Sequence, residues 1–214
     1  MLISPMKPLI LVGGGGHCKS VIDVAENAGY TILGILDRPE QVGKQVLGYE
    51  VLGTDAEMAK YKDKADFVVT VGQIKSPDLR IQLHQMLVDA GCQLATIIAP
   101  TAHASKYASI GEGTVVMHQA IVNADAKVGK GCIINTFANI EHDAVVGDCC
   151  HISTGAMING GASIAAGTFI GSQSVVNQGI KIKLGGAIIA SLSVVNKDIL
   201  EKGIFAGNPI KKIG

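Results

Sequence analysis

The sequence has no tryptophan, and aromatic residues make up only 4% of its 214 residues. Glycine, with 27 residues, and aliphatic side chains take their place. A core with so few rings indicates many short elements that stack closely. Charged residues are also few, at 17%, and 18 Lys and Arg balance 18 Asp and Glu. This balance argues against a nucleic-acid partner, and the 48% hydrophobic content argues against disorder.

Long apolar runs are scarce as well. No segment approaches the roughly 18 residues that a membrane-spanning helix requires, and the run from Pro8 to Val12 is too short for the core of a signal peptide. The five cysteines form no CxxC motif and are odd in number: Cys18, Cys92, Cys132, Cys149 and Cys150. We therefore expect reduced thiols and a cytoplasmic protein that does not insert into a membrane.

Residues 1–99 alternate between strand and helix patterns. The patterns predict strands at 8–12, 31–36, 66–71 and 93–99 and helices at 18–28 and 77–90. Gly13 to Gly16 form the turn between the first strand and the first helix. Strands joined by crossover helices imply a parallel sheet. We therefore expect a Rossmann-like α/β domain over residues 1–99.

Residues 100–214 follow a different period. From Ile110 to Val194 every sixth residue is Ile or Val, fifteen in one register, and the residue four places later is nearly always small. A period of six suits a short strand plus a turn, not a helix of about 3.6 residues per turn. The segment resembles the left-handed parallel β-helix acyltransferases. That resemblance implies three hexads per coil, with residues 18 apart stacked on one another.

Three short motifs extend the resemblance to nearly the whole chain. They are Gly-Gly-His near the start, Ile-Glu-His-Asp at 140–143 and Gly-Asn-Pro near the end. Together with the two halves, they resemble the nucleotide-sugar N-acetyltransferases of the bacillosamine and perosamine type, which act on UDP-4-amino sugars. The resemblance implies acetyl-CoA as cosubstrate, a nucleotide-sugar substrate, direct attack by the amine, and a homotrimer with active sites between subunits.

Glu141-His142-Asp143 is the candidate catalytic run. An ammonium must lose protons before its nitrogen attacks a thioester, and histidine titrates in the range that suits a base. The resemblance implies that His142 is the base and that Asp143 raises its basicity. Gly160 lies one coil above His142, where its N–H could stabilise the oxyanion. From periodicity alone, an ordinary surface histidine and a turn glycine remain alternatives.

The remaining candidate residues bind ligands. For acetyl-CoA the resemblance implies His151, placed at a coil corner, Gly160, and the stacked pair Ser172 and Ala190, although Ala190 stands where a glycine is expected. For the nucleotide, glycines at a helix start let a diphosphate approach backbone N–H groups. The positions that match the family's substrate contacts are Gly15, Gly16, His17, Asp37, Arg38, Gly72 and Asn135.

The outward positions of the repeat are also informative. Several are apolar and should form a contiguous surface of the kind that marks an interface, here that of a trimer: Met117, Ile121, Ile133, Phe137, Val145, Met157, Phe169 and Val175.

Other functions remain open on the sequence. A sialic-acid or sugar O-acetyltransferase would use the same base on a hydroxyl, and a non-catalytic nucleotide-sugar-binding protein could share the fold. An NAD-dependent dehydrogenase would need a second domain of another type, and none follows the glycine-rich turn in this sequence. The β-helix carbonic anhydrases need two histidines five residues apart, whereas His103, His118, His142 and His151 are separated by 15, 24 and 9. We therefore expect no metal.

Overall fold

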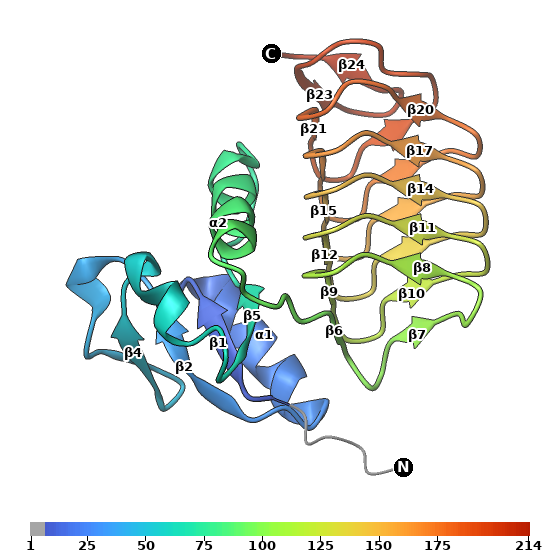
Figure 1. Ribbon diagram of the computed structural model, residues 1–214. Coiled ribbons are helices and arrows are strands. Elements are labelled where there is room, and N and C mark those ends of the chain that lie inside the picture. The colour runs from blue at the N-terminus through green and yellow to red at the C-terminus, as the bar shows by residue number, and fades with distance from the viewer. Residues whose placement is uncertain (1–6) are drawn as a thin grey trace.

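The computed structural model describes residues 7–214, so residues 1–6 of the predicted first domain lie outside the described residues. The N-terminal part is a five-stranded sheet in the order β3-β4-β2-β1-β5 (Figure 1). Strand β1 (Leu9–Val12) pairs in parallel with the central strand β2 (Ile32–Leu36) on one side and with the edge strand β5 (Asp66–Val69) on the other. A parallel sheet was predicted, and its first three strands are confirmed within a few residues.

The two helices pack on opposite faces of this sheet. Successive residues of a strand point to opposite faces; Leu9 and Leu11 pack with α1 (Gly16–Asn27), and Ile10 and Val12 with α2 (Asp78–Asp89). Both predicted helices are therefore present.

The edge of the sheet was not predicted. β3 (Gln45–Val46) and β4 (Tyr49–Gly53) form an antiparallel hairpin there. The short 3₁₀ helices η1 (Pro39–Gln41) and η2 (Asp55–Lys60) complete the domain.

From Ile97 onward the chain coils into a β-helix with three parallel sheets, which meet at three columns of turns (Figure 1). The domain-facing sheet contains β6 (Ile97–Ile98), β9 (Val115–Val116), β12 (Ile133–Ile134), β15 (His151–Ile152), β18 (Phe169–Ile170), β21 (Ile188–Ile189), β23 (Ile204–Ala206) and the antiparallel β24 (Lys211–Lys212). The second sheet contains β7 (His103–Ala104), β10 (Ile121–Val122), β13 (Asn139–Ile140), β16 (Met157–Ile158), β19 (Val175–Val176) and β22 (Val194–Val195). The third sheet contains β8 (Ser109–Ile110), β11 (Lys127–Val128), β14 (Val145–Val146), β17 (Ser163–Ile164) and β20 (Lys181–Ile182).

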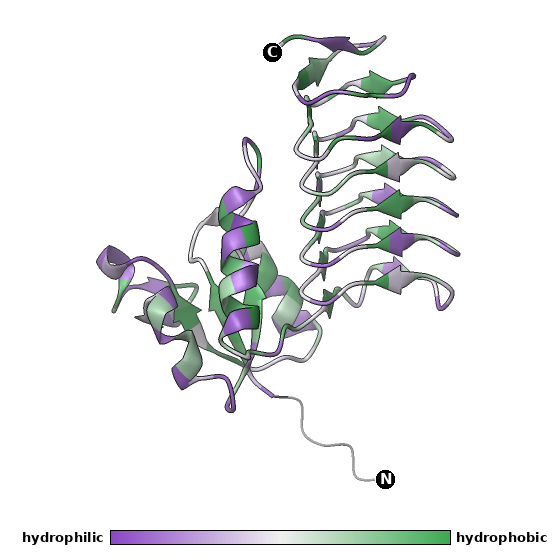
Figure 2. Cartoon of the chain, turned by 45° about the horizontal axis from the view of Figure 1, so that its top comes forward, coloured by the Kyte–Doolittle hydropathy of each residue, from purple (hydrophilic) through white to green (hydrophobic). Residues whose placement is uncertain are grey.

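The predicted inward register is confirmed over most of the β-helix. The second residue of each strand from Val116 to Ile182 is buried, and the small residues in the turns fill the space between these aliphatic side chains. Figure 2 shows hydrophobic and hydrophilic residues side by side along the strands, as expected when one points inward and its neighbour outward.

The register shifts by one residue in the last coils. Phe169 pairs with Ile188, 19 positions later, because the turn at 183–187 holds one extra residue. The inward side chains are therefore Ile189 and Val195, each 0% exposed, and not Ile188 and Val194 as the unbroken count in sixes predicted. An insertion in a turn shifts the following strands without disturbing the ladder of hydrogen bonds.

The junction between the two parts also differs from the prediction. The strand expected at 93–99 is not the last strand of the α/β sheet, because β6 pairs with β9 of the β-helix. Only a single bridge, between Leu94 and Phe67, joins this segment to the α/β sheet. The segment therefore links the two sheets.

The N-terminal domain covers one face of the β-helix. Met117, Ile133 and Phe169, which we expected on an exposed apolar surface, are buried, because α1, α2 and the segments around them lie against the domain-facing sheet (Figure 1). Ile121 and Met157 on the second sheet, Val145 on the third sheet and Phe137 in the turn between β12 and β13 remain exposed, and Val175 is half-buried. Within residues 7–214, no helix is both long enough and apolar enough to cross a membrane.

Candidate active site

His142 lies in the turn between β13 and β14, at the corner where the second and third sheets meet. Its Nδ1 donates to Asp143 Oδ2 at 2.7 Å, and the ring is 59% exposed. This hydrogen bond and the negative charge of Asp143 raise the pKa of His142 above its ordinary value. Because Nδ1 carries the proton of the neutral ring, Nε2 has a free lone pair. Nε2 is therefore the ring atom of this pair that is available to accept a proton.

The imidazole of His142 rests on Gly160, as the 18-residue stacking predicts. A Cβ built on Gly160 would lie 2.7 Å from both Cε1 and Nε2 of His142. The same corner position holds Ala124 one coil below and Gln178 one coil above Gly160. The backbone of this corner therefore accepts side chains, and glycine at 160 leaves room for the ring.

Glu141 accepts hydrogen bonds from two side-chain amides, one in strand β13 just before it and one in the coil below. Its oxygens accept hydrogen bonds from Asn139 Nδ2 and Asn123 Nδ2, each at 2.9 Å. These bonds lower the pKa of Glu141, which therefore stays ionised close to His142. These two amide contacts, one two residues and one 18 residues away in sequence, were not predicted from the sequence.

A cavity of about 270 Å³ opens at the carboxyl end of β1, where α1 begins. It brings together six of the seven predicted substrate residues, Gly15, Gly16, His17, Asp37, Arg38 and Gly72, with Gly13, Gly14, Asp55, Val71, Leu79 and Leu83. A Cβ at Gly15 or Gly16 would meet no atom within 4 Å, so both glycines border open space. The unpaired N–H groups of the first helical turn make this end positive.

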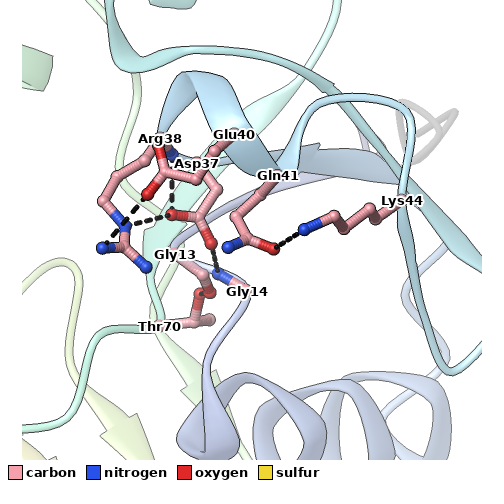
Figure 3. A network of polar contacts seen from close by, with 8 residues as sticks. All are labelled: Gly13, Gly14, Asp37, Arg38, Glu40, Gln41, Lys44 and Thr70. Carbon is pink, nitrogen blue, oxygen red and sulfur yellow. Dashed lines mark hydrogen bonds and ion pairs between the residues drawn. The ribbon is translucent and has the colours of Figure 1, made fainter.

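Asp37 holds the glycine turn in place (Figure 3). Its Oδ2 accepts from the Gly14 N–H at 2.7 Å, and its Oδ1 accepts from the Arg38 N–H at 2.7 Å. The guanidinium of Arg38 lies 3.2 Å from Glu40 and is largely exposed. Burial, and then the charge of Asp37, raise the pKa of Asp55 on the same side of the cavity. The cavity is thus lined both by carboxylates, of which Asp37 is paired with backbone N–H groups, and by the start of α1.

His151 and Asn135 lie between the β-helix and the N-terminal domain. The predicted corner position of His151 is wrong, since it is the first residue of β15 and is only 7% exposed. Its Nδ1 donates to the carbonyl of Gln73 at 2.6 Å, and its Nε2 accepts from Asn135 Nδ2 at 3.2 Å. Burial lowers the pKa of His151 to about 4, so the ring is neutral.

His17 connects this region with the cavity. Its ring centroid lies 6.5 Å from that of His151, and Nε2 is buried without a hydrogen-bond partner. Burial, then Arg80 and His151, lower the pKa of His17 to about 3. The cavity therefore ends beside the domain-facing sheet.

A single chain does not bring His142 to this cavity. The cavity adjoins the domain-facing sheet, whereas the corner between the second and third sheets, which carries His142, lies on the opposite side of the β-helix (Figure 1).

The comparisons with known proteins identify the family. The PglD N-terminal domain model matches residues 8–87. The acetyltransferase domain of PglB from Neisseria gonorrhoeae FA1090 is 30% identical, with a TM-score of 0.89 over 97% of this chain and 100% of that chain. A histidine variant of perosamine N-acetyltransferase from Caulobacter crescentus, in complex with CoA and GDP-perosamine, is 30% identical, with a TM-score of 0.90 over 97% of each chain. The chain belongs to the hexapeptide-repeat nucleotide-sugar N-acetyltransferases.

Family membership confirms the predicted fold class, a Rossmann-like domain followed by a left-handed β-helix, and the predicted acetyltransferase activity. WeeI from Acinetobacter baumannii, 22% identical with a TM-score of 0.85, shares the fold. No curated protein matches the chain significantly. In residues 7–214, no three His, Cys, Asp or Glu side chains cluster in a way that could hold a metal ion.

The predicted stack of Ser172 on Ala190 is wrong in this N-acetyltransferase. The Leu192 N–H donates to the Ser172 carbonyl, and a Cβ at Gly171 would lie 2.6 Å from the carbonyl carbon of Ala190. Ala190 therefore stacks on Gly171, because the extra residue at 183–187 shifts the last coils by one position. The Ser172 hydroxyl lies 3.0 Å from that of Ser153.

The burial of three polar residues at the domain junction was not predicted from the sequence. Arg80, His84 and Gln73 are buried although they are polar. Arg80 and His84 could have been found, because they share the spacing of Leu83 and Leu87 and so lie on the buried face of α2. No sequence signal distinguishes Gln73, which follows β5 and donates from Nε2 to the Gly167 carbonyl at 3.0 Å.

Proposed function

We propose that this enzyme transfers the acetyl group of acetyl-CoA to the 4-amino group of a UDP-linked sugar, with His142 as the general base. The observation that carries the proposal is the His142–Asp143 pair, whose free Nε2 lies over Gly160. Relatives with the same fold are solved with acetyl-CoA, or with CoA and GDP-perosamine. The resemblance to enzymes of UDP-4-amino sugars favours UDP, and GDP is the alternative to be tested.

The proposed reaction is a direct acyl transfer. The amine nitrogen attacks the thioester carbonyl while Nε2 of His142 accepts a proton from the nitrogen. The tetrahedral intermediate then expels the CoA thiolate, which takes the proton from His142, leaving an N-acetyl sugar and CoA. In residues 7–214 no acceptor pairs with the Gly160 N–H, which supports its role as a donor to the oxyanion.

The remaining site residues divide between the two ligands. Gly15, Gly16, His17, Asp37, Arg38 and Gly72 bind the nucleotide, and Asn135 lies near the sugar. Gly160, His151, Ser172 and Ala190 line the path of acetyl-CoA. Both nitrogens of the His151 ring are engaged within the chain, so its contact with acetyl-CoA is through the edge or face of the ring.

We also propose a homotrimer in which His142 of one chain meets the sugar held by the next. The separation of His142 from the cavity within one chain supports this arrangement. The apolar surface for it comes from Ile121, Val145 and Met157, exposed on the two uncovered sides, and from Phe137, exposed in the turn between β12 and β13. The five cysteines are free thiols, in keeping with a cytoplasmic enzyme.

A thiol-release assay tests the function. Acetyl-CoA would be incubated with UDP- and GDP-linked 4-amino sugars and with sialic acid. We expect release with a UDP-4-amino sugar and a loss of roughly 10²-fold or more in turnover for His142→Ala. Release with sialic acid alone would indicate O-acetylation, and no release with any member would refute the proposal.

Light scattering and subunit mixing test the shared site. A trimer has a mass of about 66 kDa, three times the 22.1 kDa of the chain. At a nucleotide-sugar concentration well below the KM of Asp37→Ala, mixing His142→Ala chains with Asp37→Ala chains should give more activity than the two variants give separately, because some sites then combine two intact halves. An active monomer would overturn the shared-site arrangement.

A further inference from the structure

Arg80 carries a buried positive charge without an ion-pair partner. It is 1% exposed and takes part in none of the ion pairs that residues 7–214 form. Its Nη2 donates to the Gly131 carbonyl at 2.7 Å, and its Nη1 donates to the carbonyls of Val69, at 3.3 Å, and Val71. Burial lowers the pKa of Arg80 to about 10, so it stays charged at neutral pH. Buried charges are costly unless an opposite charge offsets them.

The contact with Val71 places this charge behind the wall of the nucleotide cavity. Val71 and Gly72 both line the cavity. The carbonyl of Val71 and the N–H of Gly72 belong to one trans peptide group and point in opposite directions. Since the carbonyl faces Arg80, the Gly72 N–H points away from Arg80. In the described part of the chain, that N–H has no acceptor.

Gly72 faces the beginning of α1. A Cβ at Gly72 would lie 3.7 Å from Cβ of His17, in the first turn of that helix. The Gly72 N–H and the N–H groups of the first turn thus border the same end of the cavity. Asp37 and Asp55 also line the cavity, and Asp37 already accepts from the N–H groups of Gly14 and Arg38. The N–H groups at the start of α1 and that of Gly72 are therefore the donors left for a diphosphate.

The positive charge of Arg80 affects the titration of a histidine at this end of the cavity. After burial, it is a further cause that lowers the pKa of His17. It also adds to the lowering of the pKa of His84 and His151 by burial. Neutral rings cannot offset a phosphate charge, so Arg80 is a cation of this region that can.

We propose that Arg80 is a positioning residue for the nucleotide diphosphate: it holds the Val71–Gly72 peptide with the Gly72 N–H toward the phosphates and supplies the opposite charge from behind that peptide. The inference rests on the proposed function, which puts a nucleoside diphosphate in this cavity. Arg80 itself touches no part of the substrate. The bound diphosphate in turn offsets the buried charge.

Calorimetric titration with a matched pair of probes tests this role. Uridine lacks phosphate and UDP carries the diphosphate, so the ratio of their affinities isolates the phosphate contribution; guanosine and GDP serve in the same way. We expect Arg80→Met to weaken UDP roughly tenfold or more, the scale of a hydrogen bond to a charged group, and to leave uridine unchanged. Arg80→Lys, which keeps the charge but not the fork of donors, should fall between Arg80→Met and the parent protein.

Lys64→Met is the control for net charge, since Lys64 is exposed and lies outside the cavity. Lys64→Met should change neither the affinity for uridine nor the affinity for UDP. The loss in Arg80→Met should persist at about 1 M salt, where the Debye length is about 3 Å, because a buried charge is poorly screened.

Equal losses for uridine and UDP, in Arg80→Met or in Arg80→Lys, would show that Arg80 only stabilises the domain junction and would overturn the proposal. An unchanged affinity for UDP in a folded Arg80→Met protein would also overturn the proposal. If the parent protein binds neither UDP nor GDP, the proposed function fails. If the parent protein binds UDP or GDP and Arg80→Met binds it equally well, only the role of Arg80 is refuted.

Discussion

Replacing Gly160 with alanine adds one methyl group beside His142 and so tests the proposed catalytic role of that corner of the β-helix. The new Cβ would lie 2.7 Å from Cε1 and Nε2 of His142, whereas ordinary carbon contacts begin near 3.4 Å. The ring, which is exposed on its other side, must therefore move by several tenths of an ångström or turn away. A misplacement on the order of 1 Å can cost about 10²-fold in rate. We expect turnover in the thiol-release assay to fall by roughly 10- to 10²-fold.

The fold should survive this change. Alanine and glutamine occupy the same corner position at 124 and 178, so the melting temperature should stay near that of the parent protein. The substitution also keeps the N–H of residue 160, which separates the space that glycine leaves for His142 from any role of that N–H at the oxyanion. Normal turnover in a folded Gly160→Ala protein would show that the position of the His142 ring against Gly160 does not matter for catalysis.

Three further predictions follow from the geometry. Asp143→Asn removes the carboxylate that raises the pKa of His142; the base is active when deprotonated, so the acidic limb of the pH–rate profile should move to lower pH, with a smaller loss of turnover than in His142→Ala, and an unmoved limb would contradict the pairing. Asp37→Ala frees the Gly14 N–H and should raise the KM for the nucleotide sugar about tenfold while leaving that for acetyl-CoA unchanged in initial-rate measurements. Ile189→Ala should lower the free energy of unfolding by about 2–5 kcal/mol and Ile188→Ala by clearly less, as measured by denaturant titration; equal losses would argue against the shifted register.

The β-helix could be predicted closely because its core repeats. Each inward Ile or Val contacts the copies one coil above and below, so one register explains the positions from Val116 to Ile182. The same logic placed Gly160 on His142. It failed after Ile182, where a turn of Lys183, Leu184 and two glycines accepts one more residue. Turn length is set by local backbone geometry at the surface, on which a core period has no influence.

The domain junction could not be predicted in the same way. α2 has apolar residues on more than one side, and one of them, Leu79, is exposed at the cavity. The buried positions beside Leu83 and Leu87 belong instead to Arg80 and His84. These side chains are buried because the β-helix turn at Gly131 lies against them: it accepts a hydrogen bond from Arg80 and leaves no room for a Cβ beside His84. Such partners are 47 to 51 residues apart in sequence and have no periodic relation.

The period itself argues for a site between chains. Residues 18 apart stack, as Ile133 and His151 do, so residues nine apart lie half a coil from each other. His142 and His151 are nine apart. In a three-sided coil, half a turn from the middle of one side is the opposite corner, which is where the structure has His142 relative to the domain-facing sheet. No rearrangement of side chains can close that distance across a packed aliphatic core. A sugar held beside His17 can therefore reach a histidine in the position of His142 only if a second chain presents it.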